Sequence, residues 1–102
     1  MFYSKKLKKF KEINHIFFSN KNGFSKGIYK SLNCGQGSKD SKKNIFKNLK
    51  YVSDKMLLKK NNLILMNQTH SNKVIEVKKG VFGLKKINSD AIITKTKGLG
   101  LG

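Results

Sequence analysis

The chain has 102 residues, which is the length of one small domain or of part of one. All 23 of its basic residues are lysine, five residues are acidic, and the net charge is +18. No segment approaches the roughly 20 apolar residues that a membrane helix needs, and the basic N-terminus lacks the apolar core of a signal peptide. A single cysteine, Cys34, excludes an internal disulfide. We therefore expect a cytoplasmic protein without a membrane partner.

Apolar runs and turn-forming residues predict several strands along the chain. Residues 13–18 (INHIFF) are apolar and β-prone, which predicts a strand that leads into a tight turn at Asn22-Gly23. A loop rich in turn-forming residues follows at 35–39. Later short apolar runs predict three more strands, at 63–66, 74–77 and 91–94.

One amphipathic helix is predicted over about residues 41–57. Asp40 or Ser41 suits its N-cap, because either side chain can accept from free backbone N–H groups. Beyond the cap, apolar residues recur at helical spacing and form one face of the helix. This face consists of Ile45, Leu49, Val52 and Met56, and Phe46 is expected to widen it.

Glycine alternates with leucine at 98–102, which is typical of a strand that a neighbouring segment approaches closely. No repeat or linker divides the chain. We therefore predict a single α+β unit, with residues 1–14 as a basic N-terminal segment.

The two histidines lie in different sequence settings. His15 falls inside the predicted apolar strand at 13–18, where a structural histidine is expected. His70 follows a predicted buried strand, in the polar run NQTHSN at 67–72. Because neutral imidazole is the commonest metal ligand, His70 is the candidate functional residue. A nucleophilic pair with Cys34 is an alternative, but any chain with one cysteine and two histidines offers such a pair by chance.

The positive charge leaves a second class of function open. A strong positive field attracts nucleic acid or an anionic surface without any specific site. The lysines, however, are spread along the chain, and arginine, which suits bidentate recognition of phosphates and bases, is absent. We expect no specific nucleic-acid partner, while a small basic binding protein and a non-functional remnant remain alternatives.

Short motifs resemble, in order and spacing, the N-terminal part of the YfiH family, described both as multicopper polyphenol oxidoreductase (laccase-like) and as purine nucleoside phosphorylase. The segments that carry this resemblance are HIFFS at 15–19, NGFS at 22–25, GIY at 27–29, SLN at 31–33, CGQGSKD at 34–40, QTHS at 68–71 and SDAIIT at 89–94. The resemblance implies a mixed α/β sandwich, of which residues 15–102 would form the N-terminal part.

The resemblance also implies a zinc site made by a histidine in a Gln-x-His segment, a later cysteine and a later second histidine. His70 matches the first of these ligands, whereas Cys34 lies in a different motif. Such a zinc would polarise a water or a bound phosphate, although older descriptions of the family assign copper. The complete enzymes are credited with phosphorolysis of adenosine, inosine, guanosine and methylthioadenosine, and with adenosine deamination. Purine nucleosides and phosphate are therefore the implied substrates, His70 is the candidate catalytic and metal-binding residue, and Asn33 and Gln68 are candidate substrate-binding residues from their positions.

Two of the three implied ligands are absent from the 102 residues, so we expect the chain to be inactive alone. A complementing C-terminal chain would supply the missing cysteine and histidine. Three residues also depart from the family pattern, since Asn20 replaces an arginine while Ile16 and Asn22 replace glycines. Loss of that arginine would weaken a phosphate or nucleoside site, because asparagine supplies no charged bidentate donor.

Overall fold

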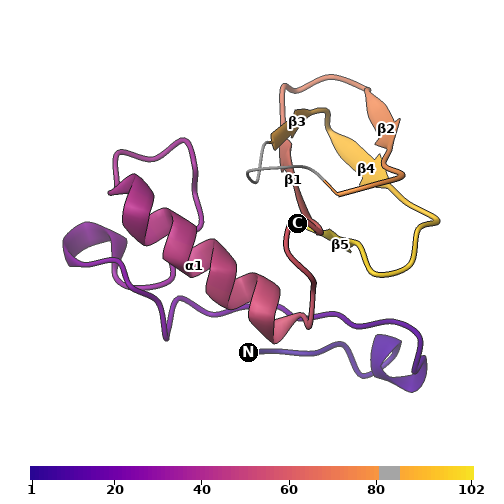
Figure 1. The fold of residues 1–102 in the computed structure, drawn as a ribbon, viewed down its shortest axis with the longest axis horizontal. Coiled ribbons are helices and arrows are strands. Elements are labelled where there is room, and N and C mark those ends of the chain that lie inside the picture. Colours follow the sequence, from indigo (N-terminus) through magenta and orange to yellow (C-terminus); the bar gives the residue numbers. More distant parts are fainter. Residues whose placement is uncertain (81–85) are drawn as a thin grey trace. The chain divides into compact units, whose positions relative to one another are not determined.

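The structure is a computed structural model that describes residues 1–80 and 86–102. The chain forms two compact units, Met1–Met56 and Leu57–Gly102. Within the described residues, the α-helix belongs to the first unit and the strands belong to the second (Figure 1). This combination confirms the mixed α+β class. None of the helices in these ranges has the length and apolar character that a membrane crossing requires.

The first unit contains α1 (Lys42–Lys55), and the predicted helix is confirmed apart from its outermost residues. Ser41 is the N-cap, and its side chain accepts a hydrogen bond from the Asn44 backbone N–H. Ile45 and Leu49 are buried, as their helical spacing predicts. The expectation that Phe46 widens this face is wrong, because its side chain is 58% exposed. A residue next to Ile45 is rotated by about 100° around the helix axis, which turns it away from the buried stripe.

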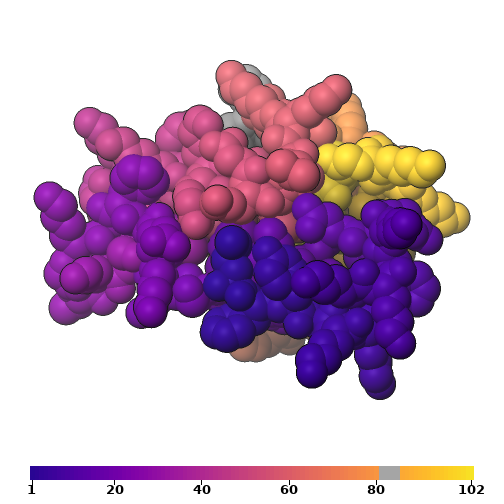
Figure 2. Space-filling model, turned by 90° about the horizontal axis from the view of Figure 1, so that it is seen from below, coloured from indigo at the N-terminus to yellow at the C-terminus, as the bar shows by residue number. Residues whose placement is uncertain are grey.

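The predicted strand over residues 13–18 is also wrong. The segment forms one isolated antiparallel bridge, in which Phe2 and Phe17 exchange backbone hydrogen bonds of 2.8 and 2.9 Å. A β-prone sequence forms a strand only where neighbouring strands pack against it, and Phe17 remains 62% exposed. Figure 2 shows the atoms of the first residues, in indigo, at the surface of this unit.

The chain bends at Asn22, where the sequence predicts a tight turn. Asn22 has a φ of 68°, in the left-handed region that glycine adopts most easily and that asparagine tolerates better than most residues. Gly23 lies against the backbone of Ser31, so that a Cβ at position 23 would lie 2.1 Å from the Ser31 carbonyl oxygen. Asparagine is therefore tolerated at position 22, whereas position 23 has no room for a side chain.

The second unit contains five short strands in its described residues. They are β1 (Leu63–Asn67), β2 (Val74–Glu76), β3 (Lys86–Asn88), β4 (Ala91–Ile93) and β5 (Gly100–Leu101). One sheet has the order β3-β1-β5, the other pairs β2 with β4, and every pairing is parallel (Figure 1). Leu63 and Ile64 of β1 and Val77 after β2 are buried and form the apolar core of this unit.

The strands predicted at 63–66, 74–77 and 91–94 are confirmed to within one residue at each end. Strand β3 was not predicted, because Lys-Ile-Asn contains a single apolar residue and its strand conformation depends on pairing with β1. The glycine-rich end forms β5, as predicted. A Cβ at Gly100 would lie 2.4 Å from a methyl carbon of Leu58, so the close approach to this strand is made by a side chain and not by another backbone.

Candidate functional site

His70 lies in the loop that follows β1, in the second unit. His70 is exposed to solvent, and its backbone has a φ of 58°, in the left-handed region. The Gln68 side chain is also exposed and lies two residues earlier in the same loop. Two of the three predicted site residues therefore lie in one loop, and both are exposed to solvent.

The Asp90 carboxylate closes this loop with four hydrogen bonds. Its Oδ1 accepts from the His70 backbone N–H at 2.8 Å. Its Oδ2 accepts from the Ser71 backbone N–H at 2.9 Å, from the Ser71 hydroxyl and from the Thr69 hydroxyl at 3.3 Å. The hydroxyl of Ser71, its backbone N–H and the other donors stabilise the ionised form, so they hold the pKa of Asp90 below its ordinary value. Asp90 is thus a carboxylate whose two oxygens both face the loop.

Asp90 is a site residue that the sequence analysis did not single out. It is one of only five acidic residues, and it stands directly before the apolar run of β4. An acidic residue at the edge of a strand, in a chain so rich in lysine, is the sequence signal that could have identified it.

The backbone around Asp90 fixes it to the strands of the second unit. The Asp90 and Ala91 N–H groups both donate to the Lys73 carbonyl, at 3.0 and 3.2 Å. On the other side, the Ser89 N–H donates to the Asn67 carbonyl at 3.2 Å, which extends the pairing of β1 with β3. The loop from β1 to β2 is therefore held at its base by backbone bonds and at its tip by the carboxylate.

Asn33, the third predicted site residue, belongs to the first unit, where its side chain is bonded to its own surroundings. Its Oδ1 accepts from the Gly35 N–H at 3.0 Å. Its Nδ2 donates to the Ser38 hydroxyl at 3.0 Å and to the Asp40 carboxylate at 3.1 Å. Both ends of the amide therefore stabilise the loop at 33–40, which is the structural role that the geometry supports for Asn33.

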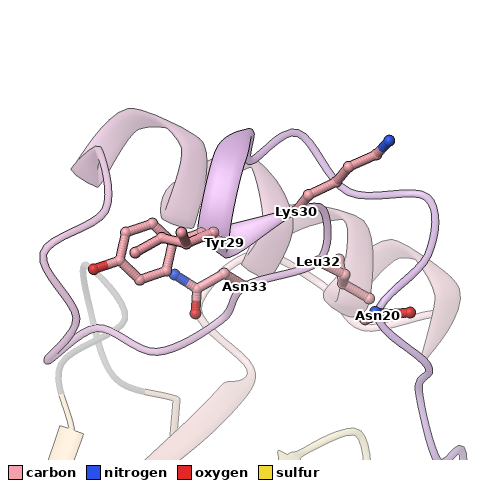
Figure 3. A pocket seen from close by; sticks show the side chains of 6 residues that line it. Asn20, Tyr29, Lys30, Leu32 and Asn33 are labelled. Atoms are coloured by element: carbon pink, nitrogen blue, oxygen red, sulfur yellow. The ribbon is translucent and has the colours of Figure 1, made fainter.

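A shallow pocket of about 210 Å³ lies beside Asn33 (Figure 3). It is lined by Asn20, Ile28, Tyr29, Lys30, Leu32 and Asn33. In Figure 3 the Lys30 side chain extends away from the other lining side chains. Asn20 lines this pocket with a neutral amide, so its side chain adds no positive charge to the wall.

Asp40 organises the loop that precedes α1. Its Oδ2 accepts from the buried Ser25 hydroxyl, and its Oδ1 accepts from the Ser41 N–H at 2.7 Å. The Ser25 hydroxyl bond is the largest cause that lowers the pKa of Asp40, with smaller contributions from the Asn33 amide and the Ser41 N–H. The folded unit therefore binds a proton at Asp40 less readily than the unfolded chain does.

This lowered pKa predicts a loss of stability of the first unit in acid. The contribution of Asp40 is fully present above the unfolded-state pKa of about 3.9 and is lost as the pH falls through the lower folded pKa. We expect Asp40→Asn to flatten the decline in unfolding free energy over this acid range, measured by urea denaturation at a series of pH values. Asp54→Asn is the matched control, because it makes the same charge change at an exposed ion pair with Lys50. An unchanged acid decline in the Asp40 variant would contradict the prediction.

The remaining histidine and the cysteine are in structural positions. The His15 Nε2 accepts a hydrogen bond of 2.7 Å from the Ser4 N–H, and its ring meets that of Tyr3 edge-on at 5.9 Å. The prediction of a structural histidine is therefore confirmed. Cys34 is a half-buried free thiol, and burial raises its pKa. A raised pKa leaves less of the nucleophilic thiolate at neutral pH, which argues against a Cys34–His70 nucleophilic pair.

No group of three metal-binding side chains forms within residues 1–80 and 86–102. A catalytic zinc normally takes three protein ligands and keeps one open position. The exposed imidazole of His70 is one suitable donor, but the described residues by themselves do not fit a complete zinc or copper site.

Comparisons with known proteins place these features in a family. A model of the family described as multi-copper polyphenol oxidoreductase laccase matches residues 14–102. Among solved structures, the chain is similar to the crystal structure of the hypothetical protein YfiH from Bacillus licheniformis, with a TM-score of 0.53 and 22% sequence identity. That match covers 76% of this chain and 29% of the other, so the chain spans less than a third of that structure's length. No curated protein matches the sequence.

Proposed function

Because this chain belongs to the multi-copper polyphenol oxidoreductase laccase family, we propose that it forms part of a zinc-dependent purine nucleoside phosphorylase in which His70 is one metal ligand. The observation that carries the proposal is the loop after β1, where an exposed histidine stands on a backbone fixed by Asp90. Metal ligands are normally held in position by surrounding hydrogen bonds. The loop supplies this kind of support for His70.

We propose that the other two ligands come from a segment outside the 102 residues. Within the described residues, no three metal-binding side chains form a group. We propose that a cysteine and a histidine of a complementing C-terminal segment complete the site, in the cytoplasm. The 102 residues alone are expected to be inactive, since one imidazole does not hold a catalytic zinc.

Purine nucleosides and phosphate are the proposed substrates, with adenosine deamination as a second reaction of the same site. The exposed amide of Gln68, two residues before His70, supports this proposal. The amide offers both a hydrogen-bond donor and an acceptor to a bound nucleoside. Asn33 is a weaker candidate for substrate binding than Gln68, since its amide is already bonded to Gly35, Ser38 and Asp40.

The experiment combines the purified chain with a C-terminal chain of the family that carries the later cysteine and histidine. We expect zinc binding and phosphorolysis of inosine and adenosine by the mixture, and neither by the 102 residues alone. His70→Ala should abolish zinc binding and lower the activity by at least about 100-fold, because a metal supplies several kcal/mol of transition-state stabilisation. His15→Gln is the matched control and should retain both properties, since glutamine still offers an acceptor to Ser4.

Three results would overturn parts of the proposal. Zinc binding and activity that survive in His70→Ala would show that His70 is not a ligand. Phosphorolysis by the 102 residues alone would remove the need for a second segment. If the mixture of the two chains leaves purine nucleosides unchanged, these nucleosides are not its substrates.

A basic binding protein is the second candidate function, favoured by aromatic side chains that stand exposed on a chain of net charge +18. Phe2 is 67% and Phe17 is 62% exposed. Stacking of bases on such rings typically contributes about 1–3 kcal/mol per base. This function requires binding to single-stranded DNA that persists at about 150 mM salt and weakens in Phe17→Ala. Binding that disappears at this salt concentration and ignores Phe17 would reflect charge alone.

A further inference from the structure

The conformation of His70 requires an explanation that the sequence of the loop does not provide. Its φ of 58° lies in the left-handed region, which residues with a Cβ rarely adopt. The loop from 68 to 73 contains no glycine that would favour such a turn. Hydrogen bonds from outside the loop can supply the interactions that hold His70 in this conformation.

We propose that Asp90 is a positioning residue that fixes the backbone of His70, and with it the direction in which the imidazole leaves the chain. The inference rests on the proposed role of His70. The φ and ψ angles of a residue set the direction of its Cα–Cβ bond, so a carboxylate that fixes these angles also orients the side chain.

Both oxygens of the carboxylate take part in this role. The His70 N–H donates to Oδ1 at 2.8 Å, and the Ser71 N–H donates to Oδ2 at 2.9 Å. The hydroxyls of Ser71 and Thr69 add two further donors to Oδ2. Two consecutive N–H groups that converge on one anion require a sharply curved backbone, of the kind that left-handed residues provide.

Asp90 is suited to this role because its own backbone is fixed. Its N–H and that of Ala91 donate to the Lys73 carbonyl, and it stands directly before β4, which pairs with β2. The carboxylate therefore joins the tip of the loop to the frame of the sheet. Since both of its oxygens accept hydrogen bonds from the loop, Asp90 acts through the backbone of His70.

The test follows the backbone of His70 by nuclear magnetic resonance in the isotope-labelled 102-residue chain. A residue with φ near +60° brings its amide and α hydrogens close together, so the wild-type chain should show a strong cross peak between them at His70. Asp90→Asn should markedly weaken this cross peak and increase the exchange rate of the His70 amide hydrogen by at least about tenfold. The reason is that asparagine has one oxygen, so it must present its NH₂ group to one of the two backbone N–H donors.

Two matched variants separate positioning from general effects. Asp54→Asn makes the same change in charge at the exposed ion pair with Lys50 and should leave the His70 cross peak intact. Ser71→Ala removes one hydroxyl donor, retains both backbone donors and should also preserve it. Contacts between β2 and β4, read from the same spectra, should be unchanged in all three variants.

Several outcomes would overturn the inference. A wild-type cross peak no stronger than those of the strand residues would show that His70 does not hold the left-handed conformation. A cross peak that keeps its full strength in Asp90→Asn would show that the carboxylate is not what fixes it. Loss of the β2–β4 contacts in this variant would make Asp90 a residue of general stability. None of these measurements depends on zinc or on nucleosides, so the inference and the proposed function fail by different results.

Discussion

Replacement of Asn48 by alanine should destabilise the first unit by about 1–5 kcal/mol, a large part of the stability of a small unit. Asn48 lies on α1 and is fully buried. Its Oδ1 accepts from the Phe24 N–H at 2.7 Å, and its Nδ2 donates to the Ser25 hydroxyl at 2.9 Å and to the Asn33 carbonyl at 2.7 Å. The Asn48 amide therefore connects α1 to two other segments, at residues 24–25 and at Asn33.

The size of this effect comes from the partners that alanine leaves behind. Each buried donor or acceptor without a partner costs about 1–3 kcal/mol. The Phe24 N–H and the Asn33 carbonyl would both lose the bonds to Asn48, while the Ser25 hydroxyl retains its bond to Asp40. The higher helix propensity of alanine offsets only about 0.7 kcal/mol of this loss.

Urea denaturation followed by far-ultraviolet circular dichroism measures the change, because α1 contributes the α-helical signal of the described residues. Asn44→Ala is the matched control, since it makes the same substitution on the same helix at a residue that is only half-buried. Equal unfolding midpoints for the Asn48 and Asn44 variants would contradict the prediction and would mean that water replaces the lost bonds.

Gly23→Ala is expected to cost about 3 kcal/mol through a steric clash. A Cβ at this position would lie 2.1 Å from the Ser31 carbonyl oxygen and 2.4 Å from the Leu32 Cα. These are backbone atoms, which cannot turn aside as the end of a flexible side chain can. The segment around Ser31 would have to move, which would break the bond from the Ser25 N–H to the Ser31 carbonyl and that from the Gly23 N–H to the Ser31 hydroxyl.

Gly37→Ala is the matched control for this variant. No atom lies within 4 Å of the position that a Cβ at Gly37 would take. The control should be neutral or slightly stabilising, because alanine restricts the unfolded chain more than glycine does. Equal thermal unfolding midpoints for the two variants would show that the loop at Ser31 moves without cost.

The elements with a strong local signal could be predicted from the sequence. Helix α1 carries its own apolar period and its own cap at Ser41, so its position follows from neighbouring residues. The segment at 13–18 has an equally strong β propensity but depends on a partner strand, which the described residues do not provide beyond the bridge to Phe2. Strand β3 is the opposite case, since its sequence is weak and its pairing with β1 determines its conformation.

The candidate site shows the same division between local and distant causes. His70 could be identified from its polar surroundings after an apolar strand, and the loop that carries it forms as expected. Asp90 lies 20 residues further along the chain, and only the fold brings its carboxylate to the His70 N–H. Asn33 stands in a motif typical of the family, but the sequence could not reveal that its amide is used within its own loop.

The order of the strands in the second unit has a consequence for the speed of folding. Strands that follow one another in the chain fall in alternate sheets, so that β1 pairs with β3 and β5 while β2 pairs with β4. Within the described residues, no two consecutive strands pair, and no hairpin is available as a local nucleus. The register joins Leu65 to Lys86 and Leu63 to Gly100, so large loops must close before the first sheet contact forms. Since folding rates fall as contacts become more distant in sequence, this unit should form later than α1, and its apolar strands should stay exposed to aggregation for longer during synthesis.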